Sequence, residues 1–447
     1  MLTKKLKNLS GMQLIALGFF ILILIGALLL MLPVSSRQRE VTPFLTALFT
    51  ATSASCVTGL VLVDTYTHWS LFGQLVLLCL IQVGGLGFIT VGTAVSIILR
   101  RKIGLKQRGW IRESFNVLDI GGVVRLIKRV IKGTFFIEGL GALLLFTRFL
   151  PRMGVLQAFY YSIFHSISAF CNAGFDLMGK YEAFSSFTAY CDDPVVTFTL
   201  IGLILSGGLG FFCWNDLADH KFQFRKYTLQ TKMVLSASGV LVFGGALLFY
   251  IIEGHQLYSG MTLTGKICAS FFSAVTPRTA GFNTTDIGGL SDAGKLLSII
   301  LMFIGGGSGS TAGGVKVGTV FVLVLYLRST LLRSPGTNIF GRRIESDTIT
   351  KASAVFCTNL FFSLIGSLLL CATQHFDLAD AMLEVVSAVS TVGMTAGLTT
   401  KLNTLSKLVI IVLMYLGRVG SLSFALSFTD HKKIAHVMQP VEPINIG

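Results

Sequence analysis

Long apolar runs separated by short polar or basic stretches dominate the hydrophobicity pattern of this chain. Residues 11–32 and 71–99 are two such runs, and neither contains a charged residue. A helix rises about 1.5 Å per residue, so roughly 20 apolar residues cross a hydrocarbon core of about 30 Å. The pattern therefore predicts membrane-spanning helices.

Six further runs of similar length are also mostly apolar, and they bring the prediction to eight membrane-spanning helices. The runs fall into four pairs, with a short motif between the two members of each pair. The pairs are 11–32 with 71–99, 126–150 with 195–217, 231–253 with 294–328, and 350–374 with 404–428.

The motif between the helices of each pair begins with serine and ends with glycine. Its four copies are Ser53-Ala-Ser-Cys-Val-Thr-Gly59, Ser168-Ala-Phe-Cys-Asn-Ala-Gly174, Ser273-Ala-Val-Thr-Pro-Arg-Thr-Ala-Gly281 and Ser387-Ala-Val-Ser-Thr-Val-Gly393. The glycines are 115, 107 and 112 residues apart, and the third copy has two additional residues. Such a period indicates internal repeats. We place them at 1–100, 101–220, 221–335 and 336–430, followed by a C-terminal tail at 431–447.

Each motif follows a stretch of about ten to fifteen moderately apolar residues, which is too short to cross a bilayer. These stretches are 44–52, 156–167, 263–272 and 378–386. Their length favours a half-helix that enters the membrane and turns back. The predicted fold is an all-α polytopic membrane protein, with four helix–re-entrant loop–helix repeats around a central pseudo-fourfold pore.

A pore is predicted because irregular backbone at membrane depth must be buried in protein or line a watery path. The negative dipole ends of four half-helices favour a cation, and backbone carbonyls can replace the hydration shell of an alkali ion. The predicted K+ selectivity filter consists of Val57, Thr58 and Gly59; Asn172, Ala173 and Gly174; Thr279, Ala280 and Gly281; and Thr391, Val392 and Gly393. Beyond these residues, Asp64, Asp176 and Asp286 either concentrate cations at the outer mouth or are simply solvated there.

Glycines also recur in the second helix of each pair, as at 84–88 and 207–211, where close packing is the alternative explanation. The third copy has six glycines in the ten positions 305–314. Each glycine disfavours a helix by about 1 kcal/mol relative to alanine, so we predict a broken helix and a gating loop, with a packing kink as the alternative. The predicted gate residues are Gly305, Gly306, Gly307, Ser308, Gly309, Ser310, Thr311, Ala312, Gly313, Gly314, Lys316 and Arg418.

Arg418 is assigned to the gate because an arginine inside a membrane-spanning helix costs at least about 2.5 kcal/mol and should face the pore or a partner. The alternative is a side chain that extends to the cytoplasmic surface. For Lys316, a role in the gate and no role are equally open. A serine hydrolase around Gly307-Ser-Gly-Ser is not predicted, because no histidine is placed to serve as its base.

The composition agrees with a membrane protein, since 53% of the 447 residues are hydrophobic and only 13% are charged. The net charge of +15 is concentrated in loops such as 100–112, 219–232 and 328–346. The positive-inside rule places these loops and both termini in the cytoplasm. No groove-reading or base-stacking pattern accompanies the basic residues, so nucleic acid is not a predicted partner.

The filter glycines and the glycine-rich loop together make the chain resemble the potassium-translocating subunits of the Trk/Ktr/HKT superfamily, over roughly residues 10 to 447. The absence of an extra N-terminal pair of helices resembles the membrane subunits of bacterial Ktr systems. The resemblance implies potassium uptake across the bacterial cytoplasmic membrane, with loop 305–316 and Arg418 as the gate. It also implies a homodimer on a cytosolic ring of nucleotide-binding, KtrA-like regulatory subunits that bind ATP or ADP. Within the superfamily, Gly59 instead of serine favours potassium over sodium.

The chain has no P-loop and no strand-linked GxGxxG, so we expect no cofactor in it; K+ is the expected transported ion and Na+ a candidate activator. The basic loops are the candidate docking surface for the ring, or serve only as topology signals and contacts for the lipid bilayer. Residues 438–447 are a candidate dimer contact. A sodium- or proton-coupled secondary transporter is the main alternative, with Glu138 as its one membrane-depth acid. An intramembrane enzyme would depend on His165, the sole histidine near a filter.

Overall fold

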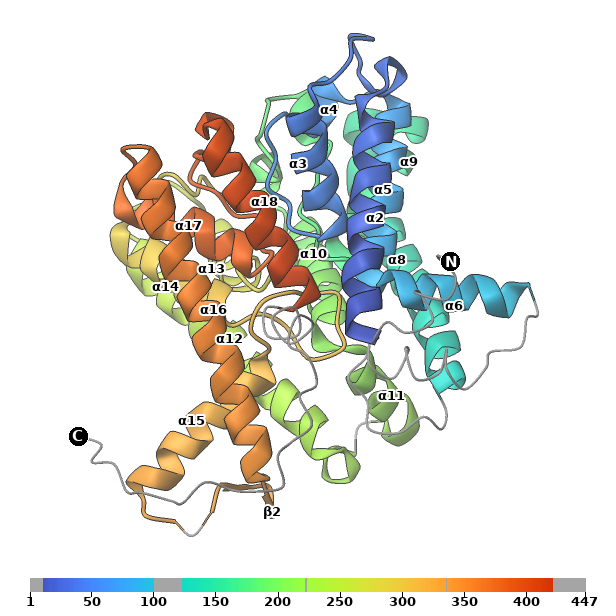
Figure 1. Cartoon of the computed structure of the whole chain (residues 1–447). Helices are drawn as coiled ribbons and strands as arrows, with labels where there is room; N and C mark the ends of the chain where they lie inside the picture. Colours follow the sequence, from blue (N-terminus) through green and yellow to red (C-terminus); the bar gives the residue numbers. More distant parts are fainter. Residues whose placement is uncertain (1–10, 100–122, 222, 335, 421–447) are drawn as a thin grey trace.

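The computed structural model describes residues 11–99, 123–221, 223–334 and 336–420, and their regular structure is almost entirely helical (Figure 1). The α-helices are α2 (Gly11–Met31), α3 (Phe44–Ser55), α4 (Thr65–His68), α5 (Leu71–Leu86), α6 (Phe88–Ile98), α8 (Val123–Met153), α9 (Val155–Phe170), α10 (Pro194–Leu209), α11 (Phe211–His220), α12 (Leu229–Glu253), α13 (Leu263–Val275), α14 (Asp292–Phe303), α15 (Val317–Leu331), α16 (Ser346–Thr373), α17 (Leu378–Val389) and α18 (Thr404–Val419). The connections contain the 3-10 helices η1 (Pro33–Ser35), η2 (Met178–Lys180), η3 (Thr188–Tyr190), η4 (Phe224–Lys226) and η5 (Thr399–Lys401), and the antiparallel strands β1 (Asn338–Ile339) and β2 (Arg342–Arg343).

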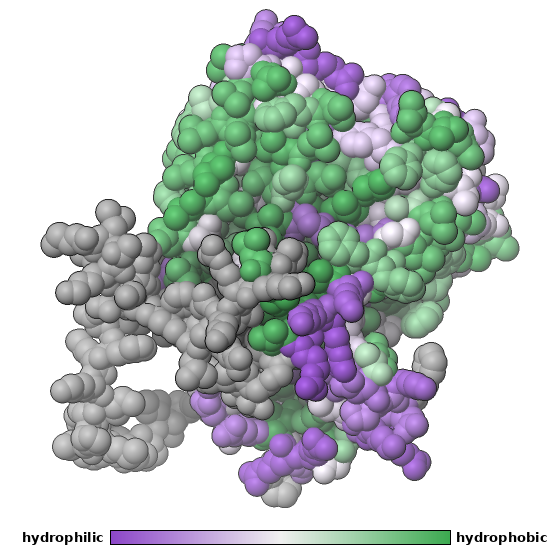
Figure 2. Space-filling view, turned by 90° about the vertical axis from the view of Figure 1, so that its right-hand side faces the viewer, coloured by the Kyte–Doolittle hydropathy of each residue, from purple (hydrophilic) through white to green (hydrophobic). Residues whose placement is uncertain are grey.

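The same succession of elements occurs four times: a long helix, a short half-helix and a further helix, which is interrupted in the first three copies. The long helices α2, α8, α12 and α16 each contain an apolar segment that can cross a membrane. The half-helices α3, α9, α13 and α17 have 12 to 16 residues, which is too short to cross, as predicted. In Figure 2, apolar side chains cover the middle of one face and hydrophilic ones gather at its two ends. The sequence limits of the repeats stay predictions.

The second helices of the first three pairs are interrupted, although the sequence predicts a break only in the third. The number of eight membrane-spanning helices stays a prediction. Residues 71–99 form α5 and α6, which runs sideways from the bundle in Figure 1. Residues 195–217 fall in α10 and α11, which meet at a bend of 96°. Among the described residues, four helices are long and apolar enough to cross a membrane, or five if this bent pair is one span.

The predicted break in the third copy is present, since residues 304–316 separate α14 from α15. In the fourth copy, α18 ends at Val419. The predicted continuation of that helix to residue 428 lies outside the described residues, as does the tail 431–447.

The repeated glycine motif ends the helix at the same place in the other three copies. In each of them the helix is followed by a glycine in the left-handed region, which glycine adopts without a steric penalty: Gly87 (φ 80°), Gly210 (φ 96°) and Gly420 (φ 95°). A second glycine, three residues earlier, lies against the last carbonyl of its own half-helix: Gly84 against Ser55, Gly207 against Phe170 and Gly417 against Val389. The motif brings the second helix onto the half-helix and then turns the chain out of the helix.

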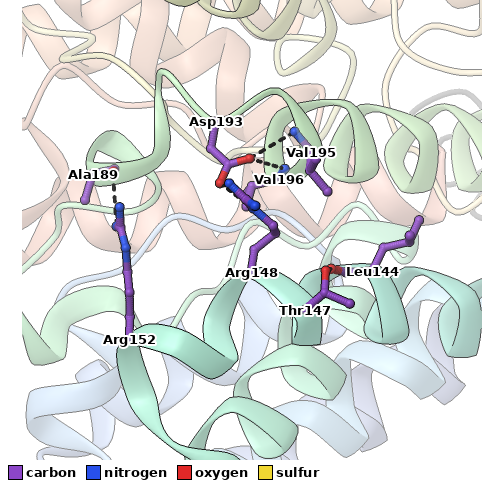
Figure 3. Close-up of polar contacts among 8 residues, drawn as sticks. All are labelled: Leu144, Thr147, Arg148, Arg152, Ala189, Asp193, Val195 and Val196. Atoms are coloured by element: carbon purple, nitrogen blue, oxygen red, sulfur yellow. Dashed lines mark hydrogen bonds and ion pairs between the residues drawn. The ribbon is translucent and has the colours of Figure 1, made fainter.

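An ion pair and a helix cap join the end of α8 to the start of α10 (Figure 3). Arg148 Nε donates to Asp193 Oδ2 at 2.8 Å, while Asp193 Oδ1 accepts from the backbone nitrogens of Val195 (3.0 Å) and Val196 (3.3 Å). One turn further along α8, Arg152 donates to the carbonyl oxygen of Ala189 at 3.5 Å. Asp193 therefore satisfies two otherwise unpaired N–H groups of α10 and also holds the two helices together.

Asp193→Ala removes both the cap and the ion pair, whereas Arg148→Ala removes only the ion pair, whose arginine side chain is 46% exposed. A helix N-cap contributes about 1 kcal/mol and an exposed ion pair less than about 1 kcal/mol. We expect Asp193→Ala to lower the midpoint of thermal unfolding of the purified protein more than Arg148→Ala does. Equal shifts for the two variants would show that the cap adds nothing.

Candidate functional site

The glycines that end the four motifs form a closed ring. A methyl group placed on any of them would lie against a carbonyl oxygen of the next repeat: Gly59 against Ala173 (2.6 Å), Gly174 against Ala280 (2.9 Å), Gly281 against Val392 (2.5 Å) and Gly393 against Thr58. No residue with a side chain fits at these positions without moving the backbone. The structure thus brings the predicted filter segments together, and all twelve predicted filter residues are buried.

The four filter segments share an unusual backbone conformation. The residue two positions before each glycine has a left-handed φ: Val57 (53°), Asn172 (58°), Thr279 (73°) and Thr391 (52°). This region costs a residue with a side chain about 1–2 kcal/mol, so the surrounding structure must hold it in place. Part of that support comes from the serine that opens the motif. The hydroxyls of Ser53 and Ser387 accept from the nitrogens of Gly59 and Gly393, each at 3.0 Å.

The third copy reaches the same conformation by a different route. Its two additional residues lie at the end of α13, where Ala280 N donates to the carbonyl of Thr276 at 2.9 Å. In the first copy, the corresponding nitrogen of Thr58 donates to Ser53, one residue further back. The Thr276 hydroxyl then donates to the Phe282 carbonyl at 2.6 Å. The additional residues therefore change how the filter segment is reached and leave its last three residues equivalent to the others.

Two ionisable side chains of the half-helices hold the chain that follows the filter. His165 in α9 is fully buried; its Nε2 accepts from Leu177 N at 3.0 Å, so its Nδ1 donates to the carbonyl of Tyr161 at 2.7 Å. Glu384 in α17 is also fully buried and accepts from the hydroxyls of Thr395 and Thr399. Both positions are nine residues before the filter glycine, and this shared register is the signal in the sequence that points to Glu384, which the sequence prediction lacks.

The position of Glu384 corrects the expectation that Glu138 is the one membrane-depth acid. Glu138 lies in α8 and is 5% exposed, and it accepts from Gln82 Nε2 at 3.1 Å. Gln82 Oε1 in turn lies 3.5 Å from Cys171 Sγ, next to the second filter segment. Glu138 accepts from Gln82, and Glu384 accepts from Thr395 and Thr399. These hydrogen bonds give both carboxyl groups a structural role.

The three acids beyond the filter have different environments. Asp64 is buried and caps α4 through the nitrogens of Tyr66 and Thr67, and it also accepts from Phe184 N at 3.0 Å. Asp176 is half-buried; its desolvation, with a smaller contribution from the Asp64 carboxylate, raises its pKa to about 7. Asp286 is exposed and accepts from Gly288 N. Asp64 is therefore a structural cap, and a role in concentrating cations stays a prediction for Asp176 and Asp286.

The loop of residues 304–316 lies directly against the filter. A methyl group on Gly313 would collide with the Thr391 side chain, and one on Gly314 would lie 3.0 Å from Ser390 Cβ. On the other side, Thr311 N donates to the Gly207 carbonyl at 3.3 Å, and its hydroxyl donates to Phe170 O at 3.3 Å. The loop therefore fills the space between the ends of the second and fourth half-helices.

The predicted gate residues form one bonded group around this loop. The Arg418 guanidinium donates to the carbonyls of Thr311 in the loop and of Gly84 and Gly85 at the end of α5, the last at 3.0 Å. Arg418 occupies the position that is glycine in the first two copies of the motif, at Gly85 and Gly208. Lys316 Nζ donates to Ala312 O at 2.6 Å and so closes the base of the loop.

The whole chain matches a known family. The model of the TrkH family, described as cation transport protein, matches residues 3–436. The chain belongs to this family. It is 40% identical to the potassium/sodium uptake protein NtpJ of Enterococcus hirae, over 99% of this chain and 98% of that protein. It is also 40% identical to the Ktr system potassium uptake protein B of Bacillus subtilis, over 93% of this chain and 92% of that protein.

Among solved structures, the TrkH family fold is found in the crystal structure of the potassium transporter TrkH from Vibrio parahaemolyticus. The TM-score is 0.71 at 19% sequence identity, covering 92% of this chain and 84% of that one. At this identity the similarity supports the fold alone. The family resemblance drawn from the filter glycines and the glycine-rich loop is confirmed.

Gly393→Ala introduces a side chain that meets the Thr58 carbonyl and requires a φ of 93°, so we expect it to distort the ring and reduce cation transport at least about tenfold. Gly239→Ala in α12 is the matched control, because a methyl group there has nothing within 4 Å. Uptake of rubidium by cells that contain equal amounts of each variant measures the difference. Normal uptake by Gly393→Ala would contradict a role of the ring in transport.

Proposed function

We propose that this chain takes up potassium ions through a pore on the axis of the glycine ring, and that the twelve filter residues form its selectivity filter. The observation that carries the proposal is the closure of the ring, in which backbone from four repeats converges at one place. Four helix C-termini at this place favour a cation, and neutral carbonyl and hydroxyl groups suit a monovalent alkali ion. Potassium is supported by the relatives, which are named as potassium or potassium/sodium uptake proteins.

The discrimination against sodium should be moderate. Each filter segment has one glycine, and the third segment is reached through a different turn, so the carbonyl rings are fewer and less uniform than in a long filter. Na+ is then a candidate both for weak transport and for activation.

Gating rests on the bonds between Arg418 and Thr311. In the described conformation, the guanidinium ties the loop to the end of α5, next to the filter. A positive charge at this place opposes the passage of cations, and movement of the loop would have to break these bonds. The loop 304–316 and Arg418 together would then act as the gate, with Lys316 holding the loop's own shape.

The proposals for regulation, assembly and location rest on the resemblance to Ktr systems, and they are supported by relatives that are named as Ktr system potassium uptake proteins. The chain would form a homodimer in the bacterial cytoplasmic membrane, with both termini in the cytoplasm. A cytosolic ring of nucleotide-binding subunits would control the gate through the basic loops, of which 219–221, 223–232 and the β1–β2 hairpin lie in the described residues.

Expression of the chain with a Ktr-type regulatory subunit should restore growth of a bacterium that lacks its own potassium uptake when potassium is limiting. Gly281→Ser should abolish the rescue, because a side chain on Gly281 would begin 2.5 Å from the Val392 carbonyl oxygen in the ring. Growth rates across a series of potassium concentrations measure the effect. The proposal fails if the unmutated chain is present in the membrane and restores no growth.

Arg418→Ala removes the bonds to Thr311, Gly84 and Gly85, so the loop loses its attachment to α5. We expect faster rubidium uptake without the regulatory subunit and a smaller response to its nucleotide. Arg148→Ala, which changes an arginine far from the loop in sequence and fold, is the control. Uptake and nucleotide response equal to those of the unmutated chain would eliminate Arg418 from the gate.

A further inference from the structure

A second buried arginine lies at the third filter, and none of the roles described so far includes it. Arg278 belongs to the longer stretch of the third motif, just after α13 ends at Val275. Its nitrogen donates to the Val275 carbonyl at 3.0 Å, which folds the chain back onto the helix end. The residue is only 3% exposed.

The guanidinium of Arg278 has little compensation from side chains. Its NH2 group donates to the Ser238 hydroxyl of α12 at 2.9 Å, while Nε and NH1 have no acceptor. None of the ion pairs between described residues includes Arg278. A full positive charge is therefore held inside the protein, and no carboxylate of the described residues forms an ion pair with it.

The end of α13 supplies the missing compensation. The C-terminus of a helix carries a partial charge of about −0.5, which stabilises a nearby cation. In return, the positive charge of Arg278 partly cancels the negative partial charge at the C-terminus of α13. The corresponding residues after the other half-helices carry no charge: Cys56, Val57 and Thr58; Cys171, Asn172 and Ala173; and Ser390, Thr391 and Val392.

Helix α12 holds the Arg278 guanidinium at a defined position relative to the loop 304–316. Ser238, which binds the guanidinium, lies one turn beyond Val234 along α12, and a methyl group on Gly307 of the loop would lie 3.3 Å from Val234 Cγ1. Arg278 is therefore held between the third filter segment and the part of α12 that the loop contacts. In this region a permeating cation meets the combined field of the four helix ends.

We infer that Arg278 sets how strongly the pore holds a cation, by offsetting the negative end of the third half-helix. The inference rests on the proposed uptake function. An ion must bind well enough to enter the pore and weakly enough to leave it. Because one of the four half-helix ends attracts the cation less, the ion stays in the ring for a shorter time. The additional residues of the third motif provide the place for this charge, which gives them a function in transport.

The test compares the concentration of rubidium that gives half-maximal uptake, in cells that lack their own potassium uptake and express the complete chain with its regulatory subunit. Arg278→Gln removes the charge, and we expect the half-maximal concentration to fall at least about threefold, together with a lower maximal rate. Arg278→Lys keeps the charge and should stay within about twofold of the unmutated chain. Ser238→Ala is the matched control, because it removes the hydrogen bond and leaves the charge.

A role of Arg278 in packing alone predicts that Ser238→Ala and Arg278→Lys resemble Arg278→Gln, and that result overturns the inference. An unchanged half-maximal concentration in Arg278→Gln also overturns it. If Arg278→Gln does not reach the membrane, Ser238→Glu places a carboxylate against the guanidinium, and it must produce the same fall for the inference to stand. Absence of rubidium uptake by the unmutated chain would instead defeat the proposed function itself.

Discussion

Backbone polar groups at membrane depth have to find partners inside the protein, and this constraint governs every irregular segment of the structure. A polypeptide that leaves its helix in the hydrocarbon region exposes N–H and C=O groups that lipid cannot satisfy. Here the four filter segments leave their helices at one place, where each lies against the backbone of the next. The serine and threonine hydroxyls of the motifs complete the pairing, for example between Ser53 and Gly59.

The same constraint accounts for the residues around the loop. At the end of α5, Arg418 from the fourth repeat donates to the carbonyls of Gly84 and Gly85, and the Gly84 carbonyl also accepts from Gly87 N at 3.2 Å. The loop, which has no helix to satisfy its backbone, bonds to Gly207, Gly208 and Phe170 of the second repeat. The buried guanidinium and the non-helical loop are thus tolerated together, because the arginine donates to loop and helix-end carbonyls that need a hydrogen-bond donor.

The four repeats share a backbone conformation, but the side chains at equivalent positions differ between them. His165 and Glu384 occupy the same register in two half-helices but bind different groups. Arg418 replaces a glycine of the repeated motif, and Arg278 lies in a stretch that the other copies lack. A closed ring of four backbone segments can in this way carry charged side chains that are placed in one repeat at a time.

The sequence by itself determined the four half-helices, the ring of glycines and the break before α15, because length, hydrophobicity and glycine content act locally on helix formation. It did not determine the bends at Gly87 and Gly210, since an apolar run with a few glycines is compatible with one straight helix. Only the tertiary structure decided that Gly84 and Gly207, three residues before these bends, lie against half-helix carbonyls, where a side chain would collide. The partners of Arg418 were decided in the same way, because they lie in the first and third repeats and become neighbours only when the repeats close around one axis. Arg278 and Glu384 bond to residues of their own repeats that lie more than ten residues away in sequence, and the folding of each repeat brings them together.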